Sequence, residues 1–356
     1  MLLKVYSQED VNTMVKRRAG EVRLGERVKV LDLSADDNWE LALSASPARY
    51  VLLGLPEDIG VRANYGRGGA YSAWNPVVAT LLNVQSNRYF TGDQLLVLGH
   101  IDFSELMQKA AALNFQDSTD VAVARELVAE IDEMVMPIIE AIVKAGKEPV
   151  IVGGGHNNAF PNIRGAVSGL QKRFNKPYAA IDCINCDAHS DLRPLEGRHS
   201  GNGFSYALAS GDLRRYAMVG LHEIFNTEAV IEQIHADDRL HATFFEDIFV
   251  KGEDGFSEAV EEAIQFAGKE FTGLELDLDT IQNIPSSAKT SSGISTIQAR
   301  KFVHMVASKC NVVYFHIGEA APVLSHIKTD LKTGKLIAYL ITDYLKAREF
   351  WHAQYS

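Results

Sequence analysis

Two histidines and four aspartates occur in three short motifs whose spacing suits metal binding. They are His156, after three glycines, the cluster Asp187, His189 and Asp191, and the pair Asp277 and Asp279. Alternate side chains of an extended segment point the same way, so each of the last two motifs can converge on one spot. Taken singly, an aspartate after a strand is more often a turn or helix-capping residue, and a histidine after glycines a structural one.

Four carboxylates packed together carry a charge of −4, which is severely unfavourable without cations. Two divalent ions would remove this repulsion. Oxygen-rich ligation with two imidazoles suits Mn²⁺, with Fe, Co or Ni as alternatives, and argues against a zinc site built from thiolates. Water shared by two such ions loses a proton near neutral pH, so the motifs predict metal-assisted hydrolysis.

Short apolar runs with helical patterns between them must position these residues. The runs predict strands over 50–54, 95–99, 149–152, 179–186, 216–220, 273–279 and 312–317. Helices are predicted over 120–147 and 295–309, the second opening with a Ser295–Gln298 capping box, and 251–262 reads as a surface loop running into a helix. Near-continuous apolar strands that alternate with helices indicate an α/β fold with a parallel sheet.

The three motifs come directly after predicted strands. At the carboxyl edge of a parallel sheet, such residues meet where ligands bind. No linker or repeat divides the chain, so we expect one domain over 46–356 and an N-terminal extension over 1–45. A TIM barrel also places its sites at strand ends, and the strand pattern alone leaves it open.

Composition restricts the class of protein. The chain has 356 residues, and 35 Lys+Arg against 46 Asp+Glu give 35 − 46 = −11. An acidic chain without a basic run is a poor binder of nucleic acid or anionic membranes. Three cysteines form no disulfide framework, and the N-terminus lacks an apolar signal segment, so we expect a cytoplasmic protein. Cys183 and Cys186 read as small buried hydrophobic residues.

The runs GGGH, CDAHSDLRPLEGRHSGN and LDLD resemble the metal motifs of the arginase/agmatinase/formimidoylglutamase (ureohydrolase) family. The resemblance implies a three-layer α/β/α sandwich around a parallel sheet of about eight strands. It also implies two Mn²⁺ per subunit, with His156 and Asp191 on one ion, His189 and Asp279 on the other, and Asp187 and Asp277 bridging. Family members are commonly homo-oligomers, and we expect the same here.

The resemblance also implies two catalytic residues. Asp191 would hydrogen-bond the shared water and move its proton in addition to binding metal. Glu319, in the segment HIGEAAP, resembles a late family glutamate and would pair with a cationic amidinium or guanidinium group of the substrate. Arg193, helped by Ser200 and Asn202, would fix a substrate carboxylate.

Departures from the arginase pattern indicate which branch of the family the chain resembles most. Phe204 stands where arginases have a proton-shuttle histidine, and Arg193 creates the D-x-R pattern of formimidoylglutamases. The segment 220–227 also looks like a formimidoylglutamase stretch, although the loop after Asp279 lacks the usual D-P-x-x-A-P-G. The preferred substrate is therefore N-formimidoyl-L-glutamate, a product of histidine degradation. The alternatives are a guanidino compound or a relative that binds metal without catalysis.

Other charged residues near the motifs keep two interpretations. Arg198 and His199 are either carboxylate contacts or solvated loop charges. His222 and Glu223 follow a strand, and surface charge is the favoured role for both.

Overall fold

The computed structural model describes residues 3–33, 37–177, 180–252, 255–325 and 331–355. Nine strands form one sheet in the order β1-β3-β2-β4-β9-β8-β5-β6-β7. The strands are β1 (Leu3–Val5), β2 (Tyr50–Gly54), β3 (Leu95–Ile101), β4 (Glu148–Val152), β5 (Ile181–Cys186), β6 (Leu213–Leu221), β7 (Leu240–Phe244), β8 (Phe271–Asp277) and β9 (Asn311–Gly318). Strand β1 pairs antiparallel with β3, and the other neighbours pair in parallel.

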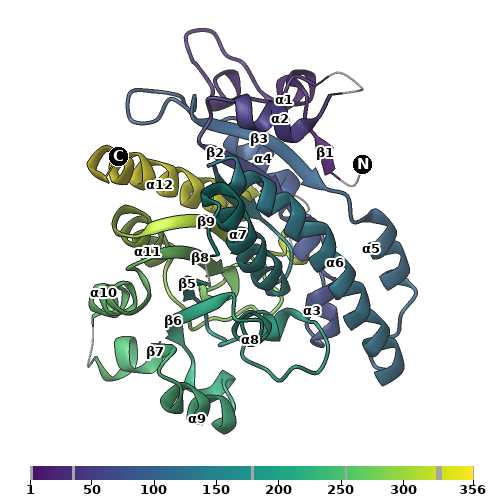
Figure 1. Ribbon diagram of the computed structural model, residues 1–356, viewed down its shortest axis with the longest axis vertical. Helices are drawn as coiled ribbons and strands as arrows, with labels where there is room; N and C mark the ends of the chain where they lie inside the picture. Colours follow the sequence, from purple (N-terminus) through teal and green to yellow (C-terminus); the bar gives the residue numbers. More distant parts are fainter. Residues whose placement is uncertain (1–2, 34–36, 178–179, 253–254, 326–330, 356) are drawn as a thin grey trace.

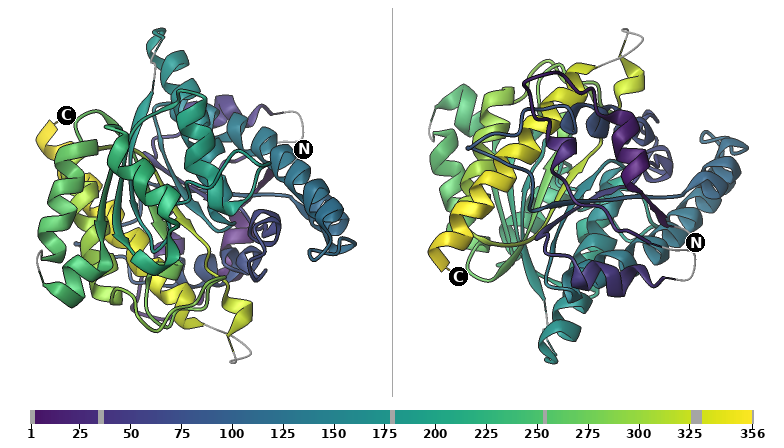
Figure 2. Two further views of the ribbon diagram at one scale, coloured as in Figure 1. Left: turned by 90° about the horizontal axis from the view of Figure 1, so that it is seen from below. Right: turned by 90° about the horizontal axis from the view of Figure 1, so that it is seen from above.

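Helices cover both faces of this sheet (Figures 1 and 2). Two buried apolar clusters lie between the layers. One cluster joins the sheet to α4 (Trp74–Leu81), α10 (Phe256–Ala267), α11 (Thr296–Lys309) and α12 (Leu331–Tyr355). The other joins it to α2 (Trp39–Ala45), α3 (Ile59–Ala63), α5 (Ser104–Ala111), α6 (Ser118–Lys144), α7 (Ala159–Phe174), α8 (Gly203–Ala209) and α9 (Glu228–Ala236). The predicted three-layer α/β/α sandwich is confirmed, and the open sheet excludes the barrel alternative.

The strand predictions are confirmed in place, with two additions. All seven predicted strands are present, although Ala179, at the start of one, lies outside the described residues. The strand predicted over 273–279 ends at Asp277, and Asp279 lies in a 3-10 turn over Leu278–Thr280. Strand β1 has three residues, too few for a period to be read, and it adds an antiparallel edge to the eight parallel strands. Strand β7 has the mixed burial of an edge strand, so its sequence lacks the continuous apolar run used for the others.

The helix predictions hold with shifted ends. Helix α6 begins after the capping residue Asp117 and ends at Lys144, three residues before the predicted end. It continues through Pro137, where an interior proline favours a break. Ser295 and Gln298 form the predicted capping box of α11. Helix α10 follows the predicted loop, of which residues 253–254 lie outside the described part.

The first 45 residues contribute to the sheet and to its core. Besides β1 they form α1 (Gln8–Met14) and α2, and Val11 and Leu24 are fully buried in the cluster beneath α4. The division at residue 45 stays a prediction about domains. Among the described residues, no helix is both long and apolar enough to cross a lipid bilayer.

A buried ion cluster fixes α12 to the amino edge of the sheet, opposite the edge that carries the motifs. Arg348 donates from Nε and Nη2 to the two oxygens of Glu148, each at 2.9 Å, and Tyr344 and His352 also contact this carboxylate. Burial alone would raise the pKa of Glu148, but the charge of Arg348 and the bond to His352 outweigh it and lower the pKa to about 2.

Replacing Arg348 by Met should destabilise the protein by about 3–5 kcal/mol, because Glu148 then stays buried without its cation. The depressed pKa makes this contribution fully present above about pH 4.5 and lost as pH falls through about 2. Urea unfolding of wild type and variant at pH 7 and pH 3 checks both points. The difference between their free energies of unfolding should be smaller at pH 3 than at pH 7. Arg300→Met, which removes a partly exposed ion pair with Asp343 between α11 and α12, is the control and should cost under about 1 kcal/mol. Equal losses for the two variants would contradict the prediction.

Candidate metal centre and substrate cavity

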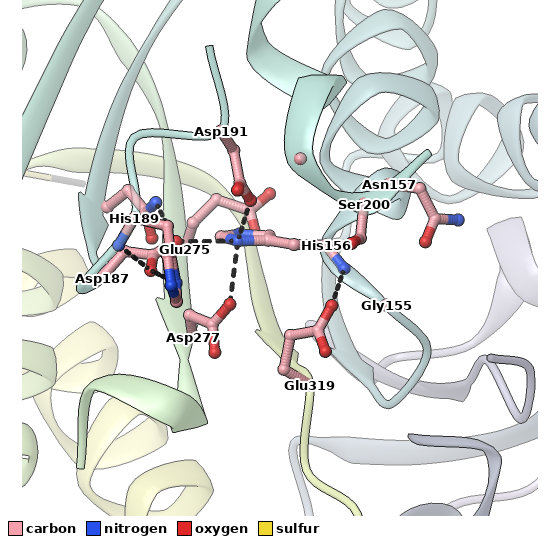
Figure 3. Close-up of polar contacts among 12 residues, drawn as sticks. Gly155, His156, Asn157, Asp187, His189, Asp191, Ser200, Glu275, Asp277 and Glu319 are labelled. Atoms are coloured by element: carbon pink, nitrogen blue, oxygen red, sulfur yellow. Dashed lines mark hydrogen bonds and ion pairs between the residues drawn. The ribbon is translucent and has the colours of Figure 1, made fainter. Parts of the chain in front are cut away.

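Four neighbouring strands at the centre of the sheet position the predicted site residues. Strand β4 leads to His156, β5 to Asp187, β8 ends at Asp277, and β9 leads to Glu319. These strands are adjacent in the order β4-β9-β8-β5 and parallel, so their carboxyl ends meet at one edge. Figure 3 shows the side chains converging there.

The Nδ1 atom of His156 faces three carboxylates. It lies 3.0 Å from Asp187 Oδ2, 2.9 Å from Asp191 Oδ2 and 3.3 Å from Asp277 Oδ2. All four side chains are buried or nearly so. One ligand atom from each residue lies within 4.8 Å of the others, so the four can surround a single ion.

A second group lies beside the first and shares one residue with it. His189 Nδ1 lies 3.2 Å from Asp279 Oδ2 and 3.6 Å from Asp187 Oδ1. Because the two oxygens of Asp187 face different histidines, this carboxylate is suited to bridge two ions. All six predicted ligands are therefore brought together, while the ion that each would bind stays a prediction.

The chemistry of these donors fits divalent metal ions. Asp279 Oδ1 is buried without a hydrogen-bond partner, which is costly unless another ligand satisfies it. Burial and the charges of Asp279 and Asp187 raise the pKa of Asp277 well above its usual range. Burial also raises the pKa of Asp279 to about 6. The protein alone thus does not stabilise all four negative charges, and cations would.

The two predicted catalytic residues have a backbone conformation that residues other than glycine rarely adopt. The φ angles are 52° at Asp191 and 64° at Glu319. Such strain costs of order 1–3 kcal/mol and clusters at functional sites. At Glu319 it turns the carboxylate toward the ligand group, where Oε1 accepts a hydrogen bond of 2.9 Å from the backbone N–H of His156 and Oε2 one of 2.6 Å from Ser287 Oγ. Burial and the charge of Asp277 raise the pKa of Glu319 to about 8.

A cavity of about 450 Å³ opens onto this edge. His189, Asp191, Asp277 and Asp279 lie in one part of its wall, together with Glu319. The rest of the wall includes Asn64, Arg193, Ser200, Phe225, Asn226, Thr227 and Ser287. Arg193 is half-exposed and is the one Lys or Arg among the described residues of the lining. A bound molecule can therefore contact the ligand group, Glu319 and one strong cation together.

The three predicted substrate residues lie in the loop between Asp191 and α8, but not all of them reach the cavity. Arg193 and Ser200 line the cavity, but Asn202 does not. The amide of Asn202 donates to the carbonyl oxygens of Pro194 and Gly197, and its Oδ1 accepts from Arg198 Nη1 at 2.9 Å. Asn202 thus holds the loop, and its predicted contact with substrate finds no support in this geometry.

Arg198 and His199, the two loop residues whose roles the sequence did not decide, are both buried. Arg198 forms an ion pair with Asp132 of α6 at 2.8 Å and donates to the carbonyl oxygen of Asn157 at 2.7 Å. His199 Nδ1 accepts from the backbone N–H of Gly201 at 3.1 Å. Burial and the charge of Arg125 lower the pKa of His199 to about 4. These contacts match neither interpretation, since Arg198 fastens the loop to the rest of the protein and His199 contacts other residues of the loop, Glu196 and Gly201.

Two further sequence interpretations concern residues after β6 and within α8. His222 is buried and stacks on Phe225 and Phe245 with ring centroids 5.1 and 4.4 Å away, so surface charge does not describe it. Phe204 is fully buried and meets the His156 ring edge-on at 5.2 Å. An apolar ring against a ligand histidine can fix its orientation but can carry no proton.

The comparisons with known proteins agree with this geometry. The sequence model of the arginase family matches residues 86–345. The chain belongs to the arginase family. It is 26% identical over 315 residues to the formimidoylglutamase of Geobacillus thermodenitrificans, covering 85% of this chain and 84% of that one. It is 28% identical over 209 residues to the Hahella chejuensis formimidoylglutamase, and this match spans only 55% of that relative's length.

A solved structure of the Trypanosoma cruzi formiminoglutamase with Mn²⁺ superposes with a TM-score of 0.68 at 19% identity, covering 92% of this chain and 98% of that one. At this identity the superposition shows the shared arginase-family fold. The predicted resemblance to this family, and within it to formimidoylglutamases, is confirmed.

Sequence reasoning missed the buried polar residues that support the arginase-family motifs. Glu57, after β2, accepts hydrogen bonds from the backbone N–H of Gly155 and from the side-chain amides of Asn157 and Asn158. It thereby holds the turn that carries His156. Gly154 in this turn has a φ of 73°, and a Cβ there would lie 2.4 Å from Asn158 Nδ2. A glutamate after an apolar strand was a possible signal, but its partners are about 100 residues away.

Glu275 is the second missed residue and contacts a ligand side chain directly. Its Oε2 lies 3.3 Å from His156 Nε2 and 2.6 Å from His316 Nδ1, and its Oε1 accepts from Tyr314 Oη at 2.8 Å. Burial would raise the pKa of Glu275, but the charge of His316 and the bonds from His156 and His316 lower it to about 2. Its signal was a charged residue within the apolar run GLELDLD.

Adding Mn²⁺ to metal-free protein should raise the free energy of unfolding by about 2.7 kcal/mol per bound ion at a free concentration of 100 times Kd. The rise should shrink below about pH 6, because ligands must lose their protons to bind metal and the pKa of Asp279 is about 6 in the metal-free protein. In Asp187→Asn most of the rise should disappear, since both groups share this carboxylate. Chemical unfolding with and without Mn²⁺ measures the effect.

Asp182→Asn is the matched control, because Asp182 is a buried aspartate of the same strand that pairs with Arg214 at the opposite edge. This variant should lose stability and keep its response to Mn²⁺. A full response in Asp187→Asn would show that the ions bind elsewhere.

Proposed function

We propose that this protein is a binuclear manganese hydrolase that cleaves a C–N bond of N-formimidoyl-L-glutamate, releasing L-glutamate and formamide. The observation that carries this proposal is Glu319, which lies beside the ligand group in the wall of a cavity that also exposes Arg193. The pKa of about 8 at Glu319 belongs to the metal-free protein, where the charge of Asp277 helps to raise it. With cations on the aspartates, the cavity offers an anion for the amidinium end of the substrate and a cation for its carboxylate end. The similarity to formimidoylglutamases supports the same substrate.

Two Mn²⁺ held by the six histidine and aspartate ligands would lower the pKa of a water molecule, so that it attacks as hydroxide near neutral pH. The residues of the chain perform the other steps. Glu319, fixed by Ser287 and the His156 N–H, pairs with the amidinium and holds its carbon in reach of the attacking oxygen. Asp191 receives the proton of the water and returns it to the leaving amine. The C–N bond breaks, formamide keeps the attacking oxygen, and the glutamate amine takes the proton.

Arg193 binds the carboxylate end of the substrate in this proposal. Its guanidinium can form two parallel hydrogen bonds to a carboxylate, and Ser200 Oγ and Asn64 add neutral polar contacts in the same wall. Glu196 Oε1 lies 3.7 Å from Arg193 Nη2 and holds the guanidinium near the cavity. Asn202 acts by shaping the loop and not by touching the substrate.

A guanidino acid is the second candidate substrate. Arg193 is the single Lys or Arg among the described lining residues, and a guanidino acid has one carboxylate where formimidoylglutamate has two. Hydrolysis would then release urea. Agmatine fits poorly, because Arg193 would repel its terminal amine. A non-catalytic relative is the third alternative, and the complete set of six ligands argues against it. The cytoplasmic location, the role in histidine degradation and a homo-oligomeric state stay predictions.

Mn²⁺-loaded protein should release equal amounts of formamide and glutamate from formimidoylglutamate and bind about two Mn²⁺ per chain. Product analysis by NMR, with elemental analysis of the same sample, measures both. The panel should include 4-guanidinobutyrate, arginine and agmatine. Urea as the main product would support the second candidate, and two bound ions without any product would contradict the proposed function.

Arg193→Met and Glu319→Gln should have different kinetic effects, because the two residues bind opposite ends of the substrate in this proposal. Arg193→Met should raise KM by about 10–100-fold with a smaller change in kcat, because it removes a contact remote from the reacting carbon. Glu319→Gln should lower kcat by at least about 100-fold and leave the Mn²⁺ content unchanged, because this residue orients the reacting group without binding metal. Steady-state kinetics and metal analysis test the pair. Loss of metal in Glu319→Gln would place this residue among the ligands instead.

A further inference from the structure

The proposed substrate carries one more charge than the cavity wall can pair. N-formimidoyl-L-glutamate has an amidinium and two carboxylates, whereas the described lining offers Glu319 and, as its single Lys or Arg, Arg193. Glu319 pairs with the amidinium and Arg193 with one carboxylate. The second carboxylate needs a cation of its own, because the chain has a net charge of −11 and disfavours anions. A cation at the rim of the cavity would supply this partner.

The loop after α3 forms part of the rim beside Arg193. Asn64 and Gly66 of this loop line the cavity, and Asn64 Nδ2 lies 3.3 Å from Ser200 Oγ. A Cβ placed on Gly201 would lie 2.7 Å from Asn64 Nδ2 and 2.8 Å from Arg193 Cδ, so both side chains reach the same glycine. The residue that follows Gly66 is therefore at the end of the cavity that holds Arg193.

Arg67 is that residue, and its side chain is exposed. Among the residues that the structure describes, the Arg67 guanidinium has no hydrogen bond, ion pair or ring contact. A guanidinium is always charged and presents parallel N–H donors that match the two oxygens of a carboxylate. Arg67 is thus an unpaired cation beside the cavity, with a side chain long enough to turn toward a bound anion.

Hydrogen bonds on both sides of Arg67 fix the backbone of this loop. The N–H of Gly66 donates to the carbonyl oxygen of Val61 at 2.9 Å, and the N–H of Gly69 donates to Oδ2 of the buried Asp58 at 2.7 Å. The Arg67 backbone is therefore in place before substrate binds, and only the side chain has to be ordered. This limits the entropy cost of binding.

The turn before Arg67 is strained. Tyr65 has a φ of 62°, which is unusual for a bulky residue, and its side chain is 59% exposed, so packing of the ring does not account for the conformation. The predicted catalytic residues Asp191 and Glu319 are strained in the same way, and such strain clusters at functional sites. At Tyr65 the turn leads the chain along the cavity wall at Gly66 and on to Arg67.

We propose that Arg67 is a substrate-binding residue that pairs with the side-chain carboxylate of N-formimidoyl-L-glutamate, while Arg193 pairs with the α-carboxylate. Arg193 follows the predicted ligand Asp191 by two positions, whereas Arg67 lies at the rim. The carboxylate nearer to the reacting amidine therefore belongs to Arg193 and the farther one to Arg67. The inference rests on the proposed function and adds a physical basis for selecting a dicarboxylate over a guanidino acid with one carboxylate.

The test compares two substrates, N-formimidoyl-L-glutamate and N-formimidoyl-L-glutamine, in which a neutral amide replaces the side-chain carboxylate. Arg67→Met should raise KM for the glutamate compound by about 5–30-fold with little change in kcat, because a charge-assisted contact remote from the reacting carbon is lost. KM for the glutamine compound should change by less than about twofold. Arg67→Lys should keep part of the preference, because it retains the charge without the planar fork.

Lys289→Met is the matched control. Lys289 is also exposed, also follows a residue of the cavity lining, Ala288, and has no ion pair or hydrogen bond with the described residues. This variant should leave KM for both compounds within about twofold of wild type. Arg193→Met should raise KM for both compounds, because both keep the α-carboxylate.

Two results would overturn the inference. Equal changes of KM for the two compounds in Arg67→Met would show a disturbed loop and not a lost carboxylate contact. A preference that disappears in Lys289→Met and persists in Arg67→Met would assign the side-chain carboxylate to the other cation of the rim.

A binding measurement separates this inference from the proposed function. Titration calorimetry with N-acetyl-L-glutamate and N-acetyl-L-glutamine needs no turnover, and Arg67→Met should weaken binding of the first by about 5–30-fold and leave the second unchanged. That result in a protein that hydrolyses no amidine would contradict the function and leave the inference standing. Hydrolysis of formimidoylglutamate with the same KM in wild type and Arg67→Met would do the opposite. A wild type that neither hydrolyses this compound nor distinguishes the two acetyl compounds would overturn both.

Discussion

Electrostatic repulsion among four buried aspartates is the constraint on which the other features of this molecule depend. Asp187, Asp191, Asp277 and Asp279 lie at one edge of a parallel sheet, where the imidazoles that contact them among the described residues are those of His156 and His189. Burial and mutual repulsion raise the pKa of Asp277 and Asp279, so the protein alone does not hold all four as anions. Cation binding relieves this repulsion and is therefore favourable. Folding brings the ligands together before the cations bind, and this lowers the stability of the metal-free protein.

The surrounding structure compensates for this cost in separate ways. Other buried carboxylates near the site have dedicated donors, as Glu57 has in the His156 turn and Glu275 has in the sheet. Arg198 uses its charge to fasten the substrate loop to α6. At the far edge, Glu148 and Arg348 tie the last helix to β4. Among the predicted ligands and catalytic residues, those with a positive φ are Asp191 and Glu319, which follow the parallel strands β5 and β9.

Local patterns predicted the parts of the site that depend on local geometry. Asp187, His189 and Asp191 share one segment, and each predicted strand places its motif at the same edge, so spacing and strand ends were enough. Glu275 and His316 escaped notice because within a strand they read as single interruptions of an apolar run. Their meaning depends on the register of β8 against β9, and no local pattern encodes that register.

Local patterns also did not settle the roles of two loop residues. Asn202 was predicted to help bind a substrate carboxylate, and Arg198 was read either as a carboxylate contact or as a solvated charge. Their side chains turn inward to other parts of the same loop and to α6. Long-range partners also explain why α6 passes through Pro137, since burial of its apolar face outweighs the lost hydrogen bond. The strands β1 and β7 lie at the two edges, where sequence patterns are weakest.

The short antiparallel strand β1 has a consequence for how copies of this protein can meet. It lies at one end of the sheet with only three residues, and Lys4 at its middle is half-exposed and pairs with Asp102. A brief, charged border of this kind discourages another chain from extending the sheet by backbone pairing. At this border aggregation through strand addition is therefore disfavoured, and contacts between copies there would be made by side chains, which leaves the sheet and its ligand-bearing edge unaltered.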